Sequence, residues 1–248
     1  MQTAASWAST LAFLGALVAL LLTAAAGPGY RLDAIGLGTA FQLIQWSVFA
    51  AGFVIVMAVV WGVTGWLGSH LRDWGTIVIS VIIAGAVAFF PLAMRAKAAA
   101  VPMIHDISTD TANPPAFAAA LAERLADNAS NPPEYDAAAA EPTRTFYRDL
   151  QSMRFAKPVN EVFAESVRTA EALGWKITQT AVSEGRIEAS ETSFWFGFTD
   201  DVVIRVVQDG ELAKVDVRSK SRVGRSDLGA NAERIRRFRD ALARRLGG

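Results

Sequence analysis

The sequence has no cysteine among its 248 residues. This absence excludes disulfide bonds, thiolate zinc sites, a catalytic cysteine and a lipid-modified cysteine anchor. The absence of cysteine is compatible with either side of a bacterial inner membrane. The chain also has no G-x-S-x-G, P-loop, H-E-x-x-H or dinucleotide-binding motif. The sequence therefore predicts no catalytic residue of these kinds, and we expect no cofactor.

Charge is scarce in the first hundred residues. The charged side chains there are Arg31, Asp33, Arg72, Asp73, Arg95 and Lys97. Between them lie uncharged, apolar stretches at about 7–26, 40–67 and 75–94. A helix of about 20 apolar residues crosses the ~30 Å hydrocarbon core of a bilayer. We predict a transmembrane region over residues 1–97, with the first helix ending at the Gly-Pro-Gly run at 27–29.

The orientation of this region rests on few charges. With the N-terminus outside, Arg31, Arg95 and Lys97 would face the cytoplasm and Arg72 would not. The positive-inside rule then favours a cytoplasmic C-terminal domain. No ionisable residue lies in the middle of a span, which argues against a transporter.

Two similar motifs, NPPAF at 113–117 and NPPEY at 131–135, mark a strap or linker over residues 98–147. Paired prolines favour extended geometry, and each motif ends in an aromatic residue that could dock on the following domain. Between the motifs, residues 117–126 are predicted to form a short helix.

Residues 148–248 show the alternation of an α+β domain. The predicted order is β-α-β-β-β-β-α, an antiparallel sheet of four to five strands with two helices on one face. A predicted strand at 149–156 precedes a helix that starts at Pro158 and ends at Gly174. The last helix is predicted from about Asp227 to Leu246, with Leu228 in its apolar stripe.

The charges of the soluble half are unevenly distributed. Residues 101–213 carry 9 basic and 18 acidic side chains, whereas residues 214–248 carry 11 basic and 4 acidic ones. The basic end could attract phosphates, lipid head groups or an acidic partner. Alternatively, it pairs with the acidic remainder of its own domain.

One candidate anion- or ligand-binding site lies where the last strand turns into the last helix. Its residues are Arg218, Arg222, Arg225, Ser226, Asp227 and Asn231. Backbone N–H groups at a helix start attract anions, and arginines strengthen such a site. In the alternative interpretation Ser226 or Asp227 caps the helix and the arginines pair with neighbouring carboxylates.

A second candidate is aromatic: Phe194, Trp195, Phe196 and Phe198 follow one another between two predicted strands. They could line an apolar pocket or contact the membrane, or they could close the end of the core. A third, weaker candidate is a metal site at His105, Asp106 and Asp110, where the acids could equally cap local turns.

Four segments of the soluble half resemble a bacterial and plastid family, domain of unknown function 1499. They are IHDISTDTANPPAF (104–117), VFAESVRTAEALGW (162–175), RIEASETSFWFGFTDDVVIRV (186–206) and VDVRSKSRVGRSDLGANAERI (215–235). The resemblance supplies no catalytic residues. Because some relatives look like lipoproteins, it implies an envelope-facing domain and shifts the expectation towards the periplasm.

These patterns leave three functions open. The first is a non-enzymatic, membrane-anchored module of the bacterial inner membrane that binds anionic lipid, another ligand or an envelope protein. The second is a carboxylate-dependent hydrolase at the membrane surface, with Asp200 and Asp201 as its compact acidic pair. The third is a structural subunit of a membrane complex. Nucleic acid is not an expected partner, because the strands lack a pattern of stacking aromatics.

Overall fold

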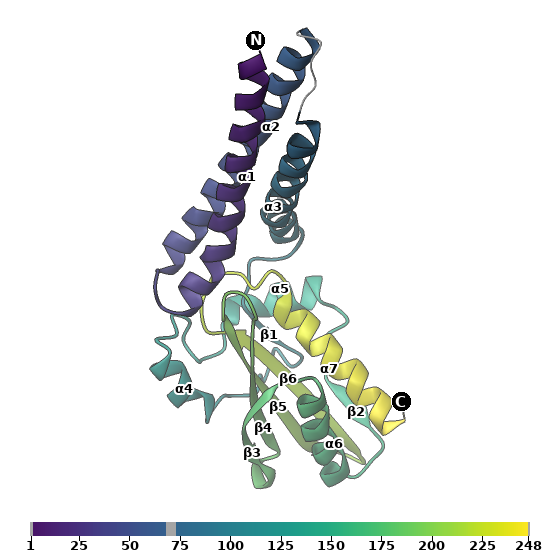
Figure 1. The fold of residues 1–248 in the computed structure, drawn as a ribbon. Coiled ribbons are helices and arrows are strands. Elements are labelled where there is room, and N and C mark those ends of the chain that lie inside the picture. The colour runs from purple at the N-terminus through teal and green to yellow at the C-terminus, as the bar shows by residue number, and fades with distance from the viewer. Residues whose placement is uncertain (1, 68–72, 248) are drawn as a thin grey trace. The chain divides into compact units, whose positions relative to one another are not determined.

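The computed structural model describes residues 2–67 and 73–247, and the chain divides into two compact units (Figure 1). One unit holds Met1–Lys97 together with Phe194–Gly197, and the other holds Ala98–Ser193 with Phe198–Gly248. The predicted class is confirmed: long apolar helices are followed by an antiparallel sheet domain with helices. Arg72, which entered the orientation argument, lies outside the described residues.

The apolar helices are α1 (Gln2–Arg31), α2 (Leu37–Leu67) and α3 (Trp74–Ala100). Each is long and apolar enough to cross a membrane. Helix α1 contacts α2 through small side chains such as Ala12, Ala16 and Ala51, all of which are buried. Small residues let helix backbones approach closely in lipid, where van der Waals packing drives association.

The expected end of the first helix at residues 27–29 is wrong. Helix α1 continues through Pro28 to Arg31, and the Leu32 N–H donates to the Pro28 carbonyl at 2.9 Å. A proline in the last turn removes only its own hydrogen bond to the preceding turn. The flanking glycines add no side-chain bulk, so the helix tolerates this loss.

The soluble domain departs from the prediction in three short elements, β1, η1 and α5, and β1 brings its sheet to six strands instead of the predicted four to five. Its helices and strands are β1 (Asp106–Ser108), α4 (Ala120–Ala126), η1 (Ala137–Ala139), α5 (Ala140–Phe146), β2 (Met153–Phe155), α6 (Val159–Ala172), β3 (Lys176–Ala181), η2 (Val182–Glu184), β4 (Arg186–Thr192), β5 (Thr199–Asp209), β6 (Leu212–Ser221) and α7 (Ala230–Leu246). The last helix starts later than expected, because Leu228 lies in the preceding turn with φ of 54°.

Strands β3 to β6 form an antiparallel meander in the order β6-β5-β4-β3. Both β1 and β2 pair with the outer edge of β6: Asp106 lies opposite Lys220, and Met153 lies opposite Val215. Two three-residue strands thus share one long edge. The strap segment reaches the sheet through β1.

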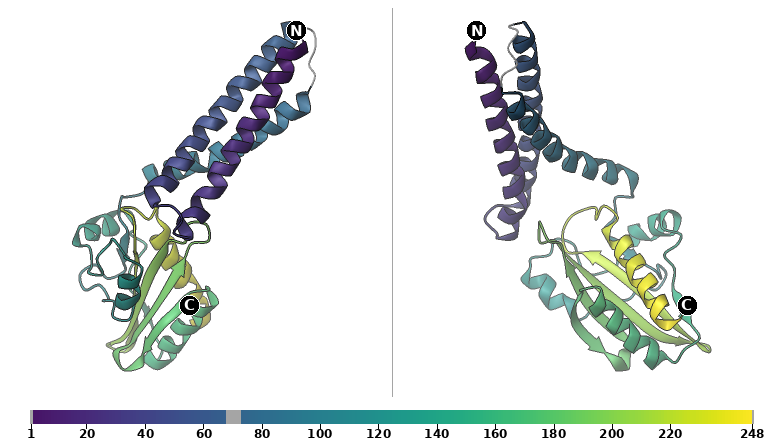
Figure 2. Two further views of the ribbon diagram at one scale, coloured as in Figure 1. Left: turned by 60° about the vertical axis from the view of Figure 1, so that its left-hand side comes forward. Right: turned by 45° about the vertical axis from the view of Figure 1, so that its right-hand side comes forward.

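Helices α6 and α7 cover one face of this sheet (Figure 2). The strands turn alternate apolar residues, such as Ile204 and Val217, towards these helices, and both are fully buried. Phe238 of α7 stacks on Trp175 with ring centroids 5.5 Å apart. This layer is the hydrophobic core of the domain.

The basic residues of α7 pair largely within the domain. Arg236 bonds Asp149 at 2.7 Å, Arg237 lies 3.1 Å from Glu191, and Arg245 lies 3.6 Å from Glu165. These contacts agree with the second interpretation, in which the basic C-terminal segment pairs with acidic residues of its own domain.

The pair of Asp149 and Arg236 makes stability depend on pH. The hydrogen bond from Arg236 lowers the pKa of Asp149 from its ordinary 3.8 to about 2. Because the folded-state value is the lower one, the pair stabilises the fold above the unfolded pKa and loses its effect as pH falls towards about 2. Asp149 is 44% exposed, so we expect Asp149→Asn to cost less than about 1 kcal/mol at neutral pH.

Thermal unfolding of wild type and Asp149→Asn across this range measures the effect. The two proteins should differ at neutral pH and converge in strong acid. A difference that stays constant down to the lowest pH would contradict the assignment.

Candidate functional site

The sheet face opposite α6 and α7 is charged, yet much of it is buried. On β6 the outward positions are Lys214, Asp216, Arg218 and Lys220, and Arg222 follows directly after the strand. The middle of the predicted strap, residues 109–135 with α4, covers this face, and from here on the word strap means this part alone. Under it Arg218 is 2% exposed and Lys220 is 1% exposed. Burying charge is costly unless it is paired and hydrogen-bonded, so the partners of these cations decide what the face can do.

Asp106 of β1 pairs with both cations. Arg218 donates to its two carboxylate oxygens, each at 2.9 Å, and Lys220 donates to it at 3.1 Å. Asp106 itself is fully buried. Burial lowers the pKa of Lys220, while Asp106 acts in the opposite direction.

The two NPP motifs converge on Arg218. Its guanidinium donates to the carbonyls of Pro115 at 3.1 Å and Pro133 at 2.9 Å. The rings of Phe117 and Tyr135 lie 4.7 and 5.3 Å from it, within cation–π range. Each motif therefore supplies one carbonyl and one aromatic ring to the same buried arginine, which fixes the strap to the sheet.

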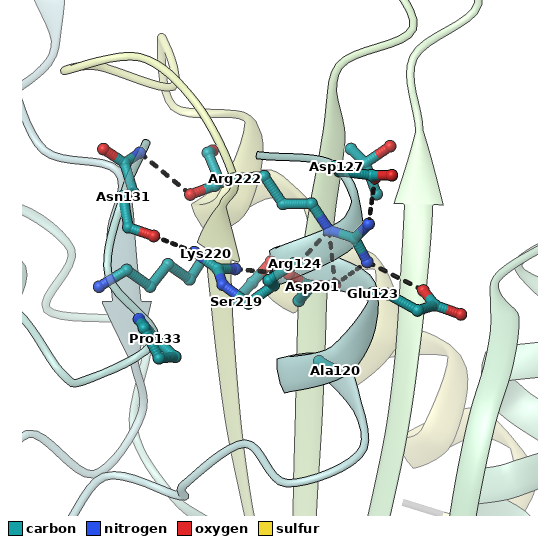
Figure 3. A network of polar contacts seen from close by, with 12 residues as sticks. Ala120, Glu123, Arg124, Asp127, Asn131, Pro133, Asp201, Ser219, Lys220 and Arg222 are labelled. Carbon is teal, nitrogen blue, oxygen red and sulfur yellow. Dashed lines mark hydrogen bonds and ion pairs between the residues drawn. The ribbon is translucent and has the colours of Figure 1, made fainter. Parts of the chain in front are cut away.

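A second buried carboxylate, Asp201 of β5, holds α4 (Figure 3). Arg124 of α4 bonds it at 2.5 Å, and Arg222, just after β6, bonds it at 2.6 Å. Arg222 also bonds Glu123 at 3.0 Å and pairs with Asp127. Burial opposes the charge of Arg222, but its bonds to these carboxylates raise its pKa above the ordinary value.

Glu188 of β4 holds the start of α4 by hydrogen bonds. Its carboxylate accepts N–H groups from Ala118, Ala119 and Ala120 at 2.9, 3.0 and 2.9 Å. A carboxylate at a helix start satisfies free N–H donors and complements the helix dipole. The fully buried Glu188 thus occupies the position that an anionic ligand would otherwise take.

The structure separates the residues of the first candidate site. The set was Arg218, Arg222, Arg225, Ser226, Asp227 and Asn231. Arg218 and Arg222 lie under the strap and form ion pairs with carboxylates, as described above. Asp227 accepts the N–H groups of Gly229 and Asn231, each at 2.8 Å, and the Ser226 hydroxyl accepts the Leu228 N–H at 3.3 Å.

Asn231 instead joins a polar cluster on the core side of the sheet. Its side chain accepts from Ser219 at 2.6 Å and donates to Ser221 at 3.0 Å. Arg225 is exposed. The six residues therefore do not form one open pocket.

The candidate metal ligands are engaged elsewhere. Asp106 binds Arg218 and Lys220, and Asp110 accepts from Lys214 at 2.8 Å and Arg205 at 3.2 Å. Among the residues that the structure describes, no group of three His, Cys, Asp or Glu side chains is placed to hold a metal ion. His105 contributes its backbone carbonyl to Ser221 and Asn231.

The aromatic residues Phe194, Trp195, Phe196 and Phe198 lie in the connection between β4 and β5. None of them belongs to the described core cluster of the soluble domain. Phe194 is 90% exposed, whereas Phe196 is buried and only 8% exposed.

The two acids after this loop point to opposite faces of the sheet. Asp201 lies under the strap, and Asp200 bonds Arg234 of α7 at 2.7 Å on the core side. Both carboxylates are thus held by arginines. This arrangement gives the hydrolase hypothesis no shared acidic site.

A cavity of about 450 Å³ opens where the strap meets the segment around α5 and β2. This volume lies within the range of small-molecule sites. Its lining residues are Thr109, Asp110, Thr111, Ala112, Thr143, Arg144, Tyr147, Arg148, Leu150, Gln151, Ser152, Arg154 and Lys214.

Cations dominate the charge of this cavity. Arg144, Arg148, Arg154 and Lys214 face a single carboxylate, Asp110. Burial would raise the pKa of Asp110, but hydrogen bonds from Lys214 and a backbone N–H lower it. Asp110 and Lys214 therefore neutralise each other, and the three arginines give the cavity its positive charge.

The arginines are held loosely. Arg144 pairs with Glu141 at 2.7 Å and Arg154 with Asp209 at 2.9 Å, and all four side chains are well exposed. Arg148 donates to the Thr145 carbonyl at 3.1 Å and forms no ion pair within the described part of the chain. Exposed ion pairs contribute little, so these guanidinium groups can turn to a ligand at small cost.

Tyr147 lines the same cavity and is 3% exposed. Its hydroxyl has no hydrogen-bond partner among the described atoms. Burial, with the nearby Asp227, raises the pKa of Tyr147 to about 12. The phenol therefore stays protonated, and its hydroxyl lies beside Gly229, in the turn before α7.

Sequence reasoning missed this cavity because its walls come from distant parts of the chain. Residues 109–112, 143–154 and 214 meet only when β1 and β2 share the edge of β6. The spacing of Arg144, Arg148 and Arg154 carries no motif, so the sequence offered no signal for it.

The comparisons with known proteins agree with the resemblance of the four segments. No curated protein matches the chain. A family model described as a protein of unknown function, DUF1499, matches residues 106–242. The match starts in β1 and ends in α7, and it covers more than half of the chain, including the strap, the sheet and the cavity. The chain therefore belongs to the DUF1499 family of proteins of unknown function.

Proposed function

We propose that this protein is a membrane-anchored, non-enzymatic module that binds a small anionic ligand in the cavity lined by Arg144, Arg148 and Arg154. The observation that carries the proposal is the charge of that cavity. Three arginines, only two of them in exposed ion pairs, surround a volume in which the one carboxylate is already neutralised.

The chemistry favours a phosphate or carboxylate group. Planar guanidinium groups bind such oxyanions through two parallel hydrogen bonds. The hydroxyl groups of Thr109 and Thr111 on the cavity wall accept from the Val217 N–H and from Arg144, so each can still donate one hydrogen bond to a ligand. An anionic lipid head group and a free phosphate share this chemistry.

Arg148→Gln tests the proposal. The change keeps a polar side chain but removes the guanidinium that lacks a carboxylate partner. A hydrogen bond to a charged group contributes about 1.5–3 kcal/mol, so we expect binding of pyrophosphate to weaken by roughly ten- to a hundredfold. Calorimetric titration of the full-length protein in zwitterionic nanodiscs measures the affinity.

Arg168→Gln is the matched control, because Arg168 is 62% exposed on α6 and lies outside the cavity. Titration with vesicles that contain phosphatidylglycerol separates a lipid ligand from a soluble one. Equal affinity of wild type, Arg148→Gln and Arg168→Gln for pyrophosphate and for these vesicles would refute the proposal.

We also propose the bacterial inner membrane as the location, with the soluble domain in the periplasm. The resemblance to lipoprotein-like relatives supports this side, although the count of Arg31, Arg95 and Lys97 supports the other. A reporter enzyme fused to the C-terminus, active only in the periplasm, distinguishes the two sides.

A further inference from the structure

The connection between β4 and β5, residues 193–198, is an uncharged loop in which four of six side chains are aromatic. We call it the aromatic loop. Two hydrogen bonds join the ends of the loop. The Ser193 N–H donates to the Phe198 carbonyl at 2.8 Å, and the Phe198 N–H donates to the Ser193 hydroxyl at 2.9 Å. Gly197 has φ of 71°, a backbone conformation that residues with a side chain rarely adopt. The loop therefore has a defined shape rather than being a loose tether.

The loop presents one almost fully exposed apolar side chain. Phe194 is 90% exposed, the highest value among the large apolar side chains in the described residues. Removing apolar surface from water gains about 25 cal/mol per Å². Tryptophan is also enriched where a bilayer meets water, and Trp195 follows Phe194 directly. An exposed phenylalanine beside a tryptophan in a turn of defined geometry is thus suited to a lipid surface.

Two features connect this loop with the membrane. Phe194–Gly197 belong to the compact unit of the three apolar helices, whereas Ser193 and Phe198 belong to the soluble domain. In addition, the acids that follow the loop present no free charge. Asp200 bonds Arg234, and Asp201 bonds Arg124 and Arg222, so no unpaired carboxylate would have to approach the lipid.

We propose that the aromatic loop inserts into the interfacial region of the bilayer and forms a second, non-helical attachment of the soluble domain to the membrane. Such a contact would restrain how the domain moves on its linker. It is independent of anion binding in the cavity, since the two sites share no residue.

The absence of native cysteine permits a direct test. Phe194→Cys in the full-length protein, labelled with a nitroxide and reconstituted in nanodiscs, reports the local environment by power saturation. We expect access to oxygen, which partitions into lipid, and loss of access to a water-soluble nickel complex. Because Phe194 is almost fully exposed, its replacement should leave the fold intact.

Val182→Cys is the control position. Val182 is 71% exposed in the turn before β4, at the opposite end of that strand from the loop. Its label should be open to the nickel complex. A label at position 194 that is as open to nickel as one at position 182 would overturn the proposal. As a second variant, Trp195→Ser in the labelled Phe194→Cys protein should restore nickel access, and unchanged protection would also count against insertion by the aromatic tip.

Discussion

Replacing Asp106 by Asn is expected to destabilise the soluble domain by about 3–5 kcal/mol, the usual effect of removing one partner of a buried ion pair. Arg218 and Lys220 remain under the strap, with 2% and 1% exposure, and lose their shared carboxylate. The asparagine keeps the volume but cannot neutralise either cation. Since domains are stable by only about 5–15 kcal/mol, a large part of the folding free energy is lost.

Hydrogen exchange of β6 amides in the detergent-solubilised full-length protein measures this loss, because protection there reports the opening of the sheet. Asp209→Asn is the matched control. It removes an ion pair by the same chemical change, but Asp209 and Arg154 are 45% and 49% exposed, so we expect a change of less than about 1 kcal/mol. Equal effects of the two substitutions would mean that the charges under the strap are solvated.

The same charged face shows where sequence reasoning reaches its limit. In β5 and β6 apolar and charged residues alternate, and Val202 and Val217 lie on the core side. Arg218 lies on the other face, where charge usually means solvent. Nothing local indicates a carboxylate partner 112 positions away in the sequence, as Asp106 is from Arg218. β1 was missed for a related reason, because three residues are too few to show a period.

The NPP motifs are an intermediate case. Their prolines indicated extended backbone, and their final aromatics indicated docking on the domain. Phe117 is indeed buried, but its partner, the guanidinium of Arg218, follows only from the tertiary structure. A local pattern predicts the conformation of a segment, whereas the partner depends on which strand edge the chain reaches.

These contacts also argue against a ligand site in the most basic segment. In residues 214–248 many cations already have carboxylate partners, as Arg218, Arg222 and Arg234 do. Arginines that are free to bind a ligand are those with weak or no partners. This criterion selects the cavity around Arg148 rather than the predicted site at the start of α7.

Replacing Phe238 by Ala is the second change with a large expected effect. Phe238 is fully buried between α7 and the sheet and stacks on Trp175, with ring planes inclined by 19°. Truncation of a buried phenylalanine removes its transfer free energy and leaves a cavity, which together cost about 3–5 kcal/mol. The three apolar helices form a separate compact unit, so the variant should remain in the membrane fraction while its soluble domain opens.

Limited proteolysis of membranes permeabilised with mild detergent distinguishes this outcome. Phe238→Ala should be cleaved rapidly within β4 to β6 and leave a membrane-retained fragment that contains α1 to α3. Phe194→Ala is the matched control, because the same truncation at a 90% exposed position leaves no cavity and should resist cleavage as wild type does. Equal resistance of both variants would show that the layer between α7 and the sheet is not what holds the domain closed.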